Sequence, residues 1–337
     1  ESRHLVVVSP RRWQAVLRTQ TGDNDGNDGI FASAADAGID YVISGEFLSG
    51  PEGLLLTSRL TDVQGGIELD ANRSSPDLTQ QALLREADRL VLMAKTALKI
   101  PHTEFVGSYS ADFAVNNMAA YEAYVGGLGY LQEFDYASAD RAFRKALELA
   151  PEFHMARYRL AQVQVVSGDT EAALAMLDRI PKDAPLSRRE RSYVDGAHAL
   201  FARDAGRAKA IYNATLEEFP FDVEARMMLV LAHDLDFEDK SAVAELERLL
   251  VQEPQNDHLW SYLGETYLRL GDYDHAREAL DRYLQLKPRD PFGFKILGDL
   301  EQLTGEPAAA VTHYQRALEL EPGFVPARFA QAQAQVF

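Results

Sequence analysis

The chain has 337 residues, of which 46% are hydrophobic and 26% charged, a composition that suits about two folded domains and excludes disorder as the general state. Lysine and arginine number 34 against 52 aspartates and glutamates, and this net charge of −18 argues against binding to nucleic acid or to an anionic membrane surface. Cysteine is absent, which excludes disulfides, thiolate zinc sites and a cysteine nucleophile.

The first 105 residues show the alternation of short apolar runs and turns that is typical of a small α+β domain. Strands are predicted over 5–8, 41–48, 54–63 and 67–73, and helices over about 10–20 and 76–99. Gly65-Gly66 indicates a hairpin between the last two strands. The predicted order is therefore β-α-β-β-β-α.

A polar loop is predicted over 21–29, and its composition raises the question of calcium binding. Asp23, Asp25 and Asn27 have the spacing of oxygen ligands in an EF-hand. Asp28 and Ala34 occupy the positions where that loop requires glycine and glutamate. Residues that favour turns explain the composition without a metal.

Motifs that carry catalysis or bind cofactors are missing from the sequence. It has no phosphate-binding loop, no dinucleotide-binding glycine pattern, no hydrolase nucleophile motif and no kinase catalytic loop. No pair of its 8 histidines has the spacing of a zinc site. We therefore expect a non-enzymatic chain without a metal or cofactor.

From residue 120 onwards the sequence repeats. Prolines recur with spacings of 34, 35, 34, 34 and 34 residues, at Pro151, Pro185, Pro220, Pro254, Pro288 and Pro322. Twelve residues before each proline stands an alanine, at Ala139, Ala173, Ala208, Ala242, Ala276 and Ala310. Such a period indicates stacked structural units, because one unit cannot bury its apolar stripe alone.

Each unit resembles the tetratricopeptide repeat (TPR), in which two antiparallel helices pack closely at small residues and proline ends the second helix. The resemblance covers about 120–337 and implies a mainly α fold, an α/α superhelix of six repeats preceded by the α+β domain. The repeats are placed at 120–153, 154–188, 189–222, 223–256, 257–290 and 291–324, with a capping helix over 325–337 and a linker over 106–119.

Two departures from the repeat are visible. Phe237 stands at a turn position that usually holds glycine. Pro181 ends the second helix of the second repeat early, and Ser187 and Glu190 form a capping-box pattern at the start of the next helix. The region 181–189 is therefore expected to be either a local irregularity of the superhelix or a simple loop insertion.

The string Ala37-Gly-Ile-Asp-Tyr-Val-Ile-Ser-Gly-Glu46, followed by Leu56-Thr-Ser-Arg-Leu-Thr-Asp-Val-Gln-Gly65, resembles the TolB amino-terminal-like domain. The resemblance covers about 35–100. The first strand and helix of such domains are not found here, so we expect a domain truncated at its N-terminus and a chain that is part of a longer polypeptide.

A TolB-like domain followed by TPRs resembles the region after the transmembrane helix of bacterial membrane regulators. Those regulators carry a Ser/Thr kinase, a nucleotide cyclase or a CadC-like winged-helix domain. The resemblance implies a protein-binding sensor or scaffold region, tethered to a membrane in the full-length protein and located in the periplasm or another extracytoplasmic space. The alternatives are a free-standing cytoplasmic TPR scaffold and the periplasmic part of a winged-helix regulator. A homodimer is a further alternative.

In the TPR family, positions 2, 5, 9 and 12 of the first helix usually line the concave face that binds a partner. The resemblance assigns to partner binding Tyr121, Tyr124, Tyr158, Gln162, Tyr193, Met227, His258 and Lys295, and adds Leu128, Met155, Glu265, Phe292 and Asp299 to the lining. These side chains either bind a protein or peptide or pack against neighbouring helices. The Lys and Asn pair that clamps chaperone tails is absent from positions 5 and 9, so that ligand is not expected.

Overall fold

The computed structural model describes residues 27–50, 53–74, 90, 93–94, 96–98 and 118–334. The described residues divide into two compact units, one up to Phe221 and the other from Asp222 onwards. The strand predicted over 5–8, the helix predicted over 10–20 and most of the linker predicted over 106–119 lie outside the described residues. The boundary between the α+β domain and the repeats thus stays a prediction.

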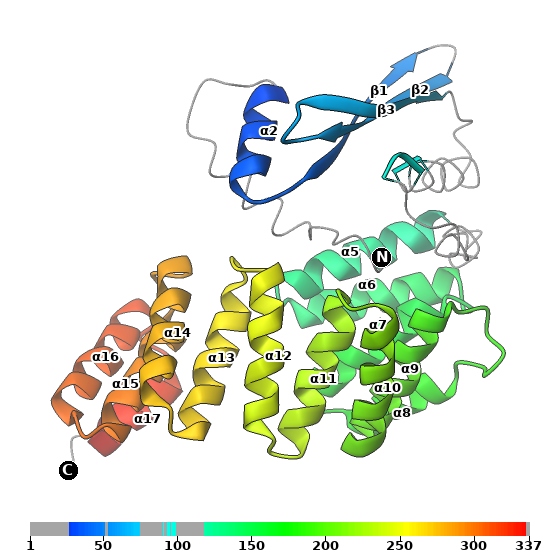
Figure 1. The fold of residues 1–337 in the computed structure, drawn as a ribbon. Helices are drawn as coiled ribbons and strands as arrows, with labels where there is room; N and C mark the ends of the chain where they lie inside the picture. Colours follow the sequence, from blue (N-terminus) through cyan, green and yellow to red (C-terminus); the bar gives the residue numbers. More distant parts are fainter. Residues whose placement is uncertain are drawn as a thin grey trace. The chain divides into compact units, whose positions relative to one another are not determined.

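The N-terminal part of the first unit contains a three-stranded antiparallel sheet. Its elements are α2 (Asn27–Asp36), β1 (Tyr41–Gly50), β2 (Gly53–Asp62) and β3 (Ile67–Ser74), with the strands in the order β1-β2-β3 (Figure 1). All three strands were predicted. The turn before β3 contains Gly66 at φ +62°, a conformation that glycine adopts without strain.

The loop predicted over 21–29 is wrong at its C-terminal end, because residues 27–29 belong to the helix α2, which begins at Asn27. The run Ile30-Phe-Ala-Ser-Ala-Ala-Asp36 that follows is rich in alanine, the best helix former, and it extends the helix back into the turn-like residues. Ala34, Ile39, Val42 and Leu60 are buried, so the small core joins residues from α2, β1 and β2 and from the segment after α2.

The described residues from 118 to 221 form three helix pairs. They are α5 (Met118–Gln132) and α6 (Tyr136–Leu149), α7 (His154–Val166) and α8 (Thr170–Asp178), and α9 (Arg188–Phe201) and α10 (Ala205–Glu218). The small residues are needed where the two helices of a pair meet. A Cβ atom at Gly196 would lie 2.5 Å from the ring of Tyr212, which is fully buried.

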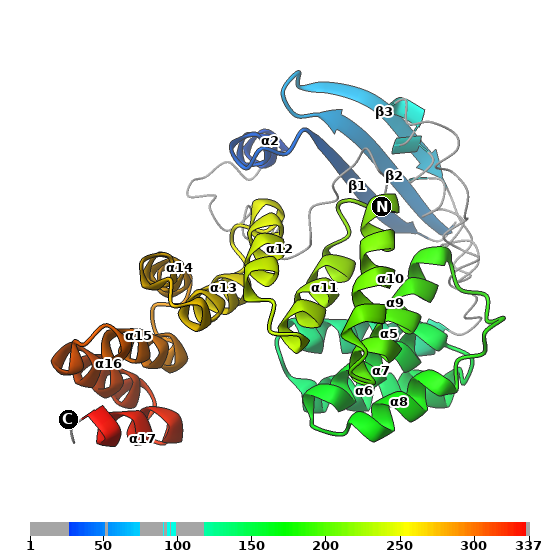
Figure 2. The ribbon, with the colours of Figure 1, turned by 60° about the horizontal axis from the view of Figure 1, so that its bottom comes forward.

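From Asp222 onwards, the described residues continue the pattern with seven helices. They are α11 (Val223–Leu235), α12 (Asp239–Gln252), α13 (Asp257–Leu270), α14 (Tyr273–Leu286), α15 (Pro291–Leu303), α16 (Pro307–Leu320) and α17 (Val325–Ala334), which follow one another in chain order (Figure 2). The core between successive helices contains four fully buried leucines, Leu246, Leu249, Leu280 and Leu300. Fourteen helices and three strands make the described residues mainly helical, as predicted.

The turn inside each helix pair places one residue in the left-handed region. These residues are Phe134, Gly168, Arg203, Phe237, Gly271 and Gly305, with φ between +58° and +87°. The backbone thus keeps the turn that the repeat requires even where the sequence offers no glycine.

The predicted irregularity near 181–189 lies between α8 and α9. The helix α8 has 9 residues and ends before Pro181, whereas α6 and α10 have 14 each. The predicted capping box is formed: the Ser187 hydroxyl accepts from the Glu190 backbone N–H at 3.2 Å, and the Glu190 carboxylate accepts from the Ser187 backbone N–H at 2.9 Å. The capping box fixes the start of α9 after the short helix α8.

Candidate functional site

The first unit places the four predicted tyrosines in two ring pairs. The rings of Tyr121 and Tyr124, both on α5, lie 6.5 Å apart. Tyr124 is 6% exposed and contacts Phe143 at 5.8 Å and Phe153 at 4.6 Å between ring centroids. Tyr124 therefore packs inside the first repeat and against the start of the second, while Tyr121 remains half-exposed.

The second pair joins two repeats. Tyr158 on α7 and Tyr193 on α9 stack at 6.2 Å with an angle of 18° between their rings. They are 0% and 6% exposed, and the Gln162 side-chain amide donates to the Tyr158 hydroxyl at 2.9 Å. The structure thus brings three predicted site residues together. Because both rings are buried, the half-buried Gln162 side chain is the more accessible part of this group.

The remaining predicted residues belong to the second unit. Met227 is half-buried and packs against the core formed by α12 and α13. The His258 side chain is 44% exposed and its Nε2 lies 3.3 Å from Asp257. Lys295 Nζ donates to Asp299 at 2.6 Å on α15. The partner-binding role of all these residues stays a prediction.

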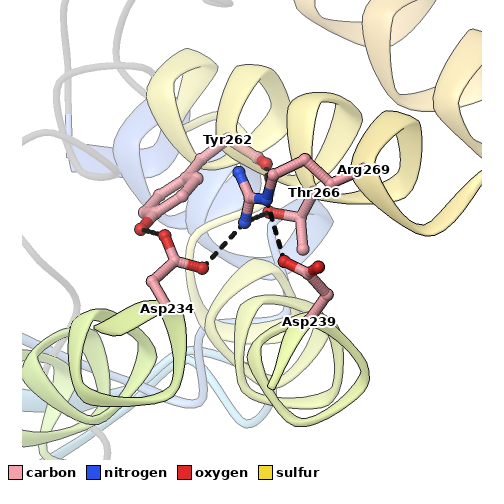
Figure 3. A network of polar contacts seen from close by, with 5 residues as sticks. All are labelled: Asp234, Asp239, Tyr262, Thr266 and Arg269. Atoms are coloured by element: carbon pink, nitrogen blue, oxygen red, sulfur yellow. Dashed lines mark hydrogen bonds and ion pairs between the residues drawn. The ribbon is translucent and has the colours of Figure 1, made fainter. Parts of the chain in front are cut away.

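A polar network connects three helices of the second unit (Figure 3). The guanidinium of Arg269 on α13 donates to Asp234 on α11 at 2.7 Å and to Asp239 on α12 at 2.8 Å. It also donates to the hydroxyl of Thr266 at 3.2 Å, and the Tyr262 hydroxyl donates to Asp234. Charge-assisted bonds from one guanidinium to two carboxylates hold these side chains in fixed positions.

Glu265 lies close to this network on the same helix. Burial raises the pKa of its carboxyl above the ordinary value of 4.5, and the charge of Asp299 adds to that rise. The charges of Arg269 and Lys295 and a hydrogen bond from Ser261 oppose it. Lys295 is itself paired with Asp299, and Asp299 accepts a hydrogen bond from the Tyr314 hydroxyl at 2.9 Å. The half-buried carboxylate of Glu265 is therefore only partly compensated by the cations around it.

These side chains form a surface on the first helices of three successive pairs, α11, α13 and α15. We call it the helix-A surface, and its residues are Asp234, Tyr262, Glu265, Arg269, Lys295 and Asp299. It carries three carboxylates against two cations, and most of its charges are already paired. Such an arrangement can accept hydrogen bonds from a ligand and bind its cationic groups.

Sequence reasoning found part of this surface. Glu265, Lys295 and Asp299 were predicted to line the concave face of the repeats. Tyr262 and Arg269 were missed, because they stand at positions 6 and 13 of their repeat, outside the four positions considered. Asp234 was missed although it stands at position 12 of its repeat, one of those four. The signal that could have found Tyr262 and Arg269 is the row of polar residues spaced three or four apart along α13, which places them on the same face of one helix.

Within the described residues, no group of three or more metal-ligating side chains is placed to hold an ion. A search of the same part of the chain finds no helix with the length and apolar character needed to cross a membrane.

Two family models, both described as tetratricopeptide repeat, match residues 130–191 and 240–291. A TPR repeat-containing protein of Pseudomonas aeruginosa is 34% identical over 73 residues, which cover 22% of this chain and 70% of that protein. The DnaJ homolog subfamily C member 7 homolog of Schizosaccharomyces pombe is 26% identical over 208 residues, covering 60% of this chain and 39% of that protein. This chain thus spans about two fifths of that relative's length.

Among solved structures, a chain of the APC/C hetero-tetramer Cut9-Hcn1 aligns with 96% of this chain and 51% of its own length. The TM-score is 0.50 and the sequence identity is 15%. At that identity the likeness concerns the fold alone.

Proposed function

Because the chain belongs to the tetratricopeptide repeat family, we propose that it is a non-catalytic module that binds a protein or peptide partner through its first helices. The helix-A surface of the second unit carries this proposal. It is polar, its side chains come from three successive repeats, and several of them are held in place by mutual hydrogen bonds. A ligand that runs along it meets α11, α13 and α15 in turn, as stacked repeats allow.

Glu265 is the residue that we expect to contact the partner. Its half-buried carboxylate is only partly compensated, so a backbone N–H or a lysine of a bound segment would stabilise its charged form. The fixed ion pairs on either side of Glu265 reduce the ordering that binding requires. The net charge of −18 adds long-range attraction for basic partners, with an association rate that falls as salt rises.

Photo-crosslinking tests this proposal. Phe292 is 39% exposed on α15, the helix of Lys295 and Asp299, and can be replaced by a photoreactive phenylalanine. In cells that naturally produce the protein, this position should yield a discrete adduct, and Glu265→Gln should reduce its amount about threefold. The same replacement at the exposed Glu319 on α16 is the control. Equal adducts at both positions, or none at Phe292, would contradict the proposal.

We also propose that this module belongs to a larger membrane-anchored signalling protein, with a Ser/Thr kinase or a nucleotide cyclase beyond the membrane and the repeats in an extracytoplasmic space. The support is the resemblance of residues 37–65 to the TolB-like strand and hairpin, together with the antiparallel arrangement of β1, β2 and β3.

The gene sequence upstream of Glu1 tests this wider context. An apolar span of about 20 residues preceded by a kinase or cyclase would support it. A winged-helix domain in that place would instead favour a transcription regulator with periplasmic repeats. The lack of any such span would favour a free-standing cytoplasmic scaffold.

A further inference from the structure

An open apolar cavity of about 320 Å³ lies between α12, α13 and α14, within the second unit. Its floor is formed by Leu250, Leu263 and Ala279, which are 6%, 4% and 2% exposed. Its volume is within the range of about 300–1,000 Å³ that is usual for ligand sites. We call it the α12–α14 groove.

One side of the groove is aromatic and held in place by hydrogen bonds. The Trp260 indole N–H donates to the carbonyl of Pro254 at 2.9 Å. The Tyr267 ring stacks on His275 at 5.2 Å between centroids, with an angle of 24°. The Tyr267 hydroxyl donates to Glu247 at 2.7 Å, so the ring cannot turn without breaking a bond to the rim.

The charged and titratable groups that line the groove are two carboxylates and the imidazole of His275, which is paired with Asp272 at 2.8 Å and whose pKa that pairing raises. Glu247 and Glu278 are exposed carboxylates at its edge, and neither lysine nor arginine is among its lining residues. Glu247 accepts the hydrogen bond from Tyr267, and the charge of Glu278 contributes to the raised pKa of the His275 imidazole. Val251, 79% exposed, completes the apolar rim.

These features together fit one kind of side chain. An apolar floor suits a flexible aliphatic stem, aromatic rings attract a cation over their faces, and a carboxylate pairs with it. A guanidinium satisfies the last two requirements better than an ammonium, because it is planar, stacks on aromatic rings and donates two parallel hydrogen bonds to a carboxylate. An acidic ligand would be repelled, and a purely apolar one would leave the rim carboxylates desolvated.

We propose that the α12–α14 groove binds an arginine side chain of a partner peptide, with its stem on the apolar floor, its guanidinium against the aromatic side and Glu278 as its counter-ion. This site goes beyond the helix-A surface and shares no residue with it.

Single-arginine peptides and tryptophan fluorescence test the proposal. The chain has 2 tryptophans, so Trp13→Phe leaves Trp260 as its only emitter. The probes are acetylated Gly-Ser-X-Ser-Gly amides in which X is arginine, lysine or citrulline, the last having the shape of arginine without its charge. The arginine peptide should change the emission of Trp260 saturably and bind about threefold more tightly than the lysine peptide, and the citrulline peptide should not bind measurably.

Charge-matched variants separate the groove from the general acidity of the chain. Glu278→Gln should weaken the arginine peptide about threefold, and Glu217→Gln, which removes an exposed carboxylate from α10, should leave its affinity unchanged. Val251→Arg should abolish the signal by placing a guanidinium at the rim, whereas Val251→Ala should retain it. Because Glu217, Val251 and Glu278 are all exposed, these variants should keep the melting temperature of the parent protein.

The outcomes are decisive in both directions. Equal binding of the citrulline and arginine peptides would overturn the proposal, as would equal losses in Glu278→Gln and Glu217→Gln, which would indicate attraction by net charge only. An unsaturable or absent fluorescence change would also overturn it. Glu265→Gln should not affect this binding, so the failure of the helix-A proposal and the failure of the groove proposal can be told apart.

Discussion

Replacing Phe237 by glycine should stabilise the protein. Phe237 occupies the left-handed turn between α11 and α12 at φ +58°, and its side chain is 85% exposed. For a residue with a Cβ atom this conformation costs about 1–2 kcal/mol. Because so little of the ring is buried, its removal forfeits little hydrophobic stabilisation.

The expected gain follows from two opposing contributions. Glycine relieves the strain but gains freedom in the unfolded chain, which costs about 0.5–1 kcal/mol. The turn's hydrogen bonds use backbone atoms only, from Phe237 N–H to the Asp234 carbonyl at 3.1 Å and from Glu238 N–H to the His233 carbonyl at 2.9 Å, so they survive the change. The free energy of unfolding should rise by about 0.5–1 kcal/mol.

Urea unfolding followed by circular dichroism measures this gain as a higher midpoint at an unchanged slope. Phe134 provides the matched comparison, since it has φ +59° in the equivalent turn but is 41% exposed and contacts the ring of Tyr136 at 6.1 Å. Phe134→Gly should gain less, because it also loses that contact. A lower midpoint for Phe237→Gly, or a larger gain for Phe134→Gly, would refute the reasoning.

Substitutions at four further positions test packing, the tyrosine pair and the titration of the helix-A surface. Gly196→Ala should lower the free energy of unfolding by about 1–3 kcal/mol, because the added Cβ atom would meet a tyrosine ring at 2.5 Å. Gly206→Ala, at an exposed position of α10, should raise it by about 0.5–1 kcal/mol. Thermal melting of the two variants measures both changes. Tyr158→Phe should lower the free energy of unfolding by about 1 kcal/mol through the lost hydrogen bond, and Tyr158→Ala should lower it by about 3–5 kcal/mol. If the affinity for a partner stays unchanged in these variants, the ring belongs to the core and not to a binding site. Burial raises the pKa of Glu265 above 4.5, so the folded state binds a proton more tightly than the unfolded state. The free energy of unfolding should therefore fall as the pH rises from about 4.5 through the raised pKa of the folded state, and then stay level. Glu265→Gln should remove this fall, and identical pH profiles of the melting temperature for parent and variant would contradict the assignment.

The helix pairs could be predicted because their physical determinants are local and recur. Proline ends the second helix of each pair, and a small residue such as Gly196 marks the point where two helices touch. The strands could be predicted for a similar reason, since the hairpin glycines and the apolar runs lie close together in sequence. The helix α2 escaped prediction because turn-forming residues at its start hid the alanine-rich run that follows.

The candidate sites depend on contacts that repeat positions do not encode. Positions within the repeat placed Tyr158 and Tyr193 on the first helices, but only the coordinates show that they stack on each other and are buried. Arg269 reaches Asp234 across 35 residues and Asp239 across 30, and nothing local in the sequence specifies either partner. The α12–α14 groove was not predicted, because it depends on the relative placement of three helices.

One helix, α13, contributes to both proposed binding sites. Successive residues of an α-helix are rotated by about 100°, so Trp260 and Tyr262 point about 200° apart, to opposite sides of the helix. Tyr267 repeats the direction of Trp260 seven residues later, and Arg269 repeats that of Tyr262 in the same way. The aromatic side of the groove and the polar network therefore lie back to back on α13. A ligand in the groove and a partner on the helix-A surface would not compete for the same atoms, so the two can occupy this unit together.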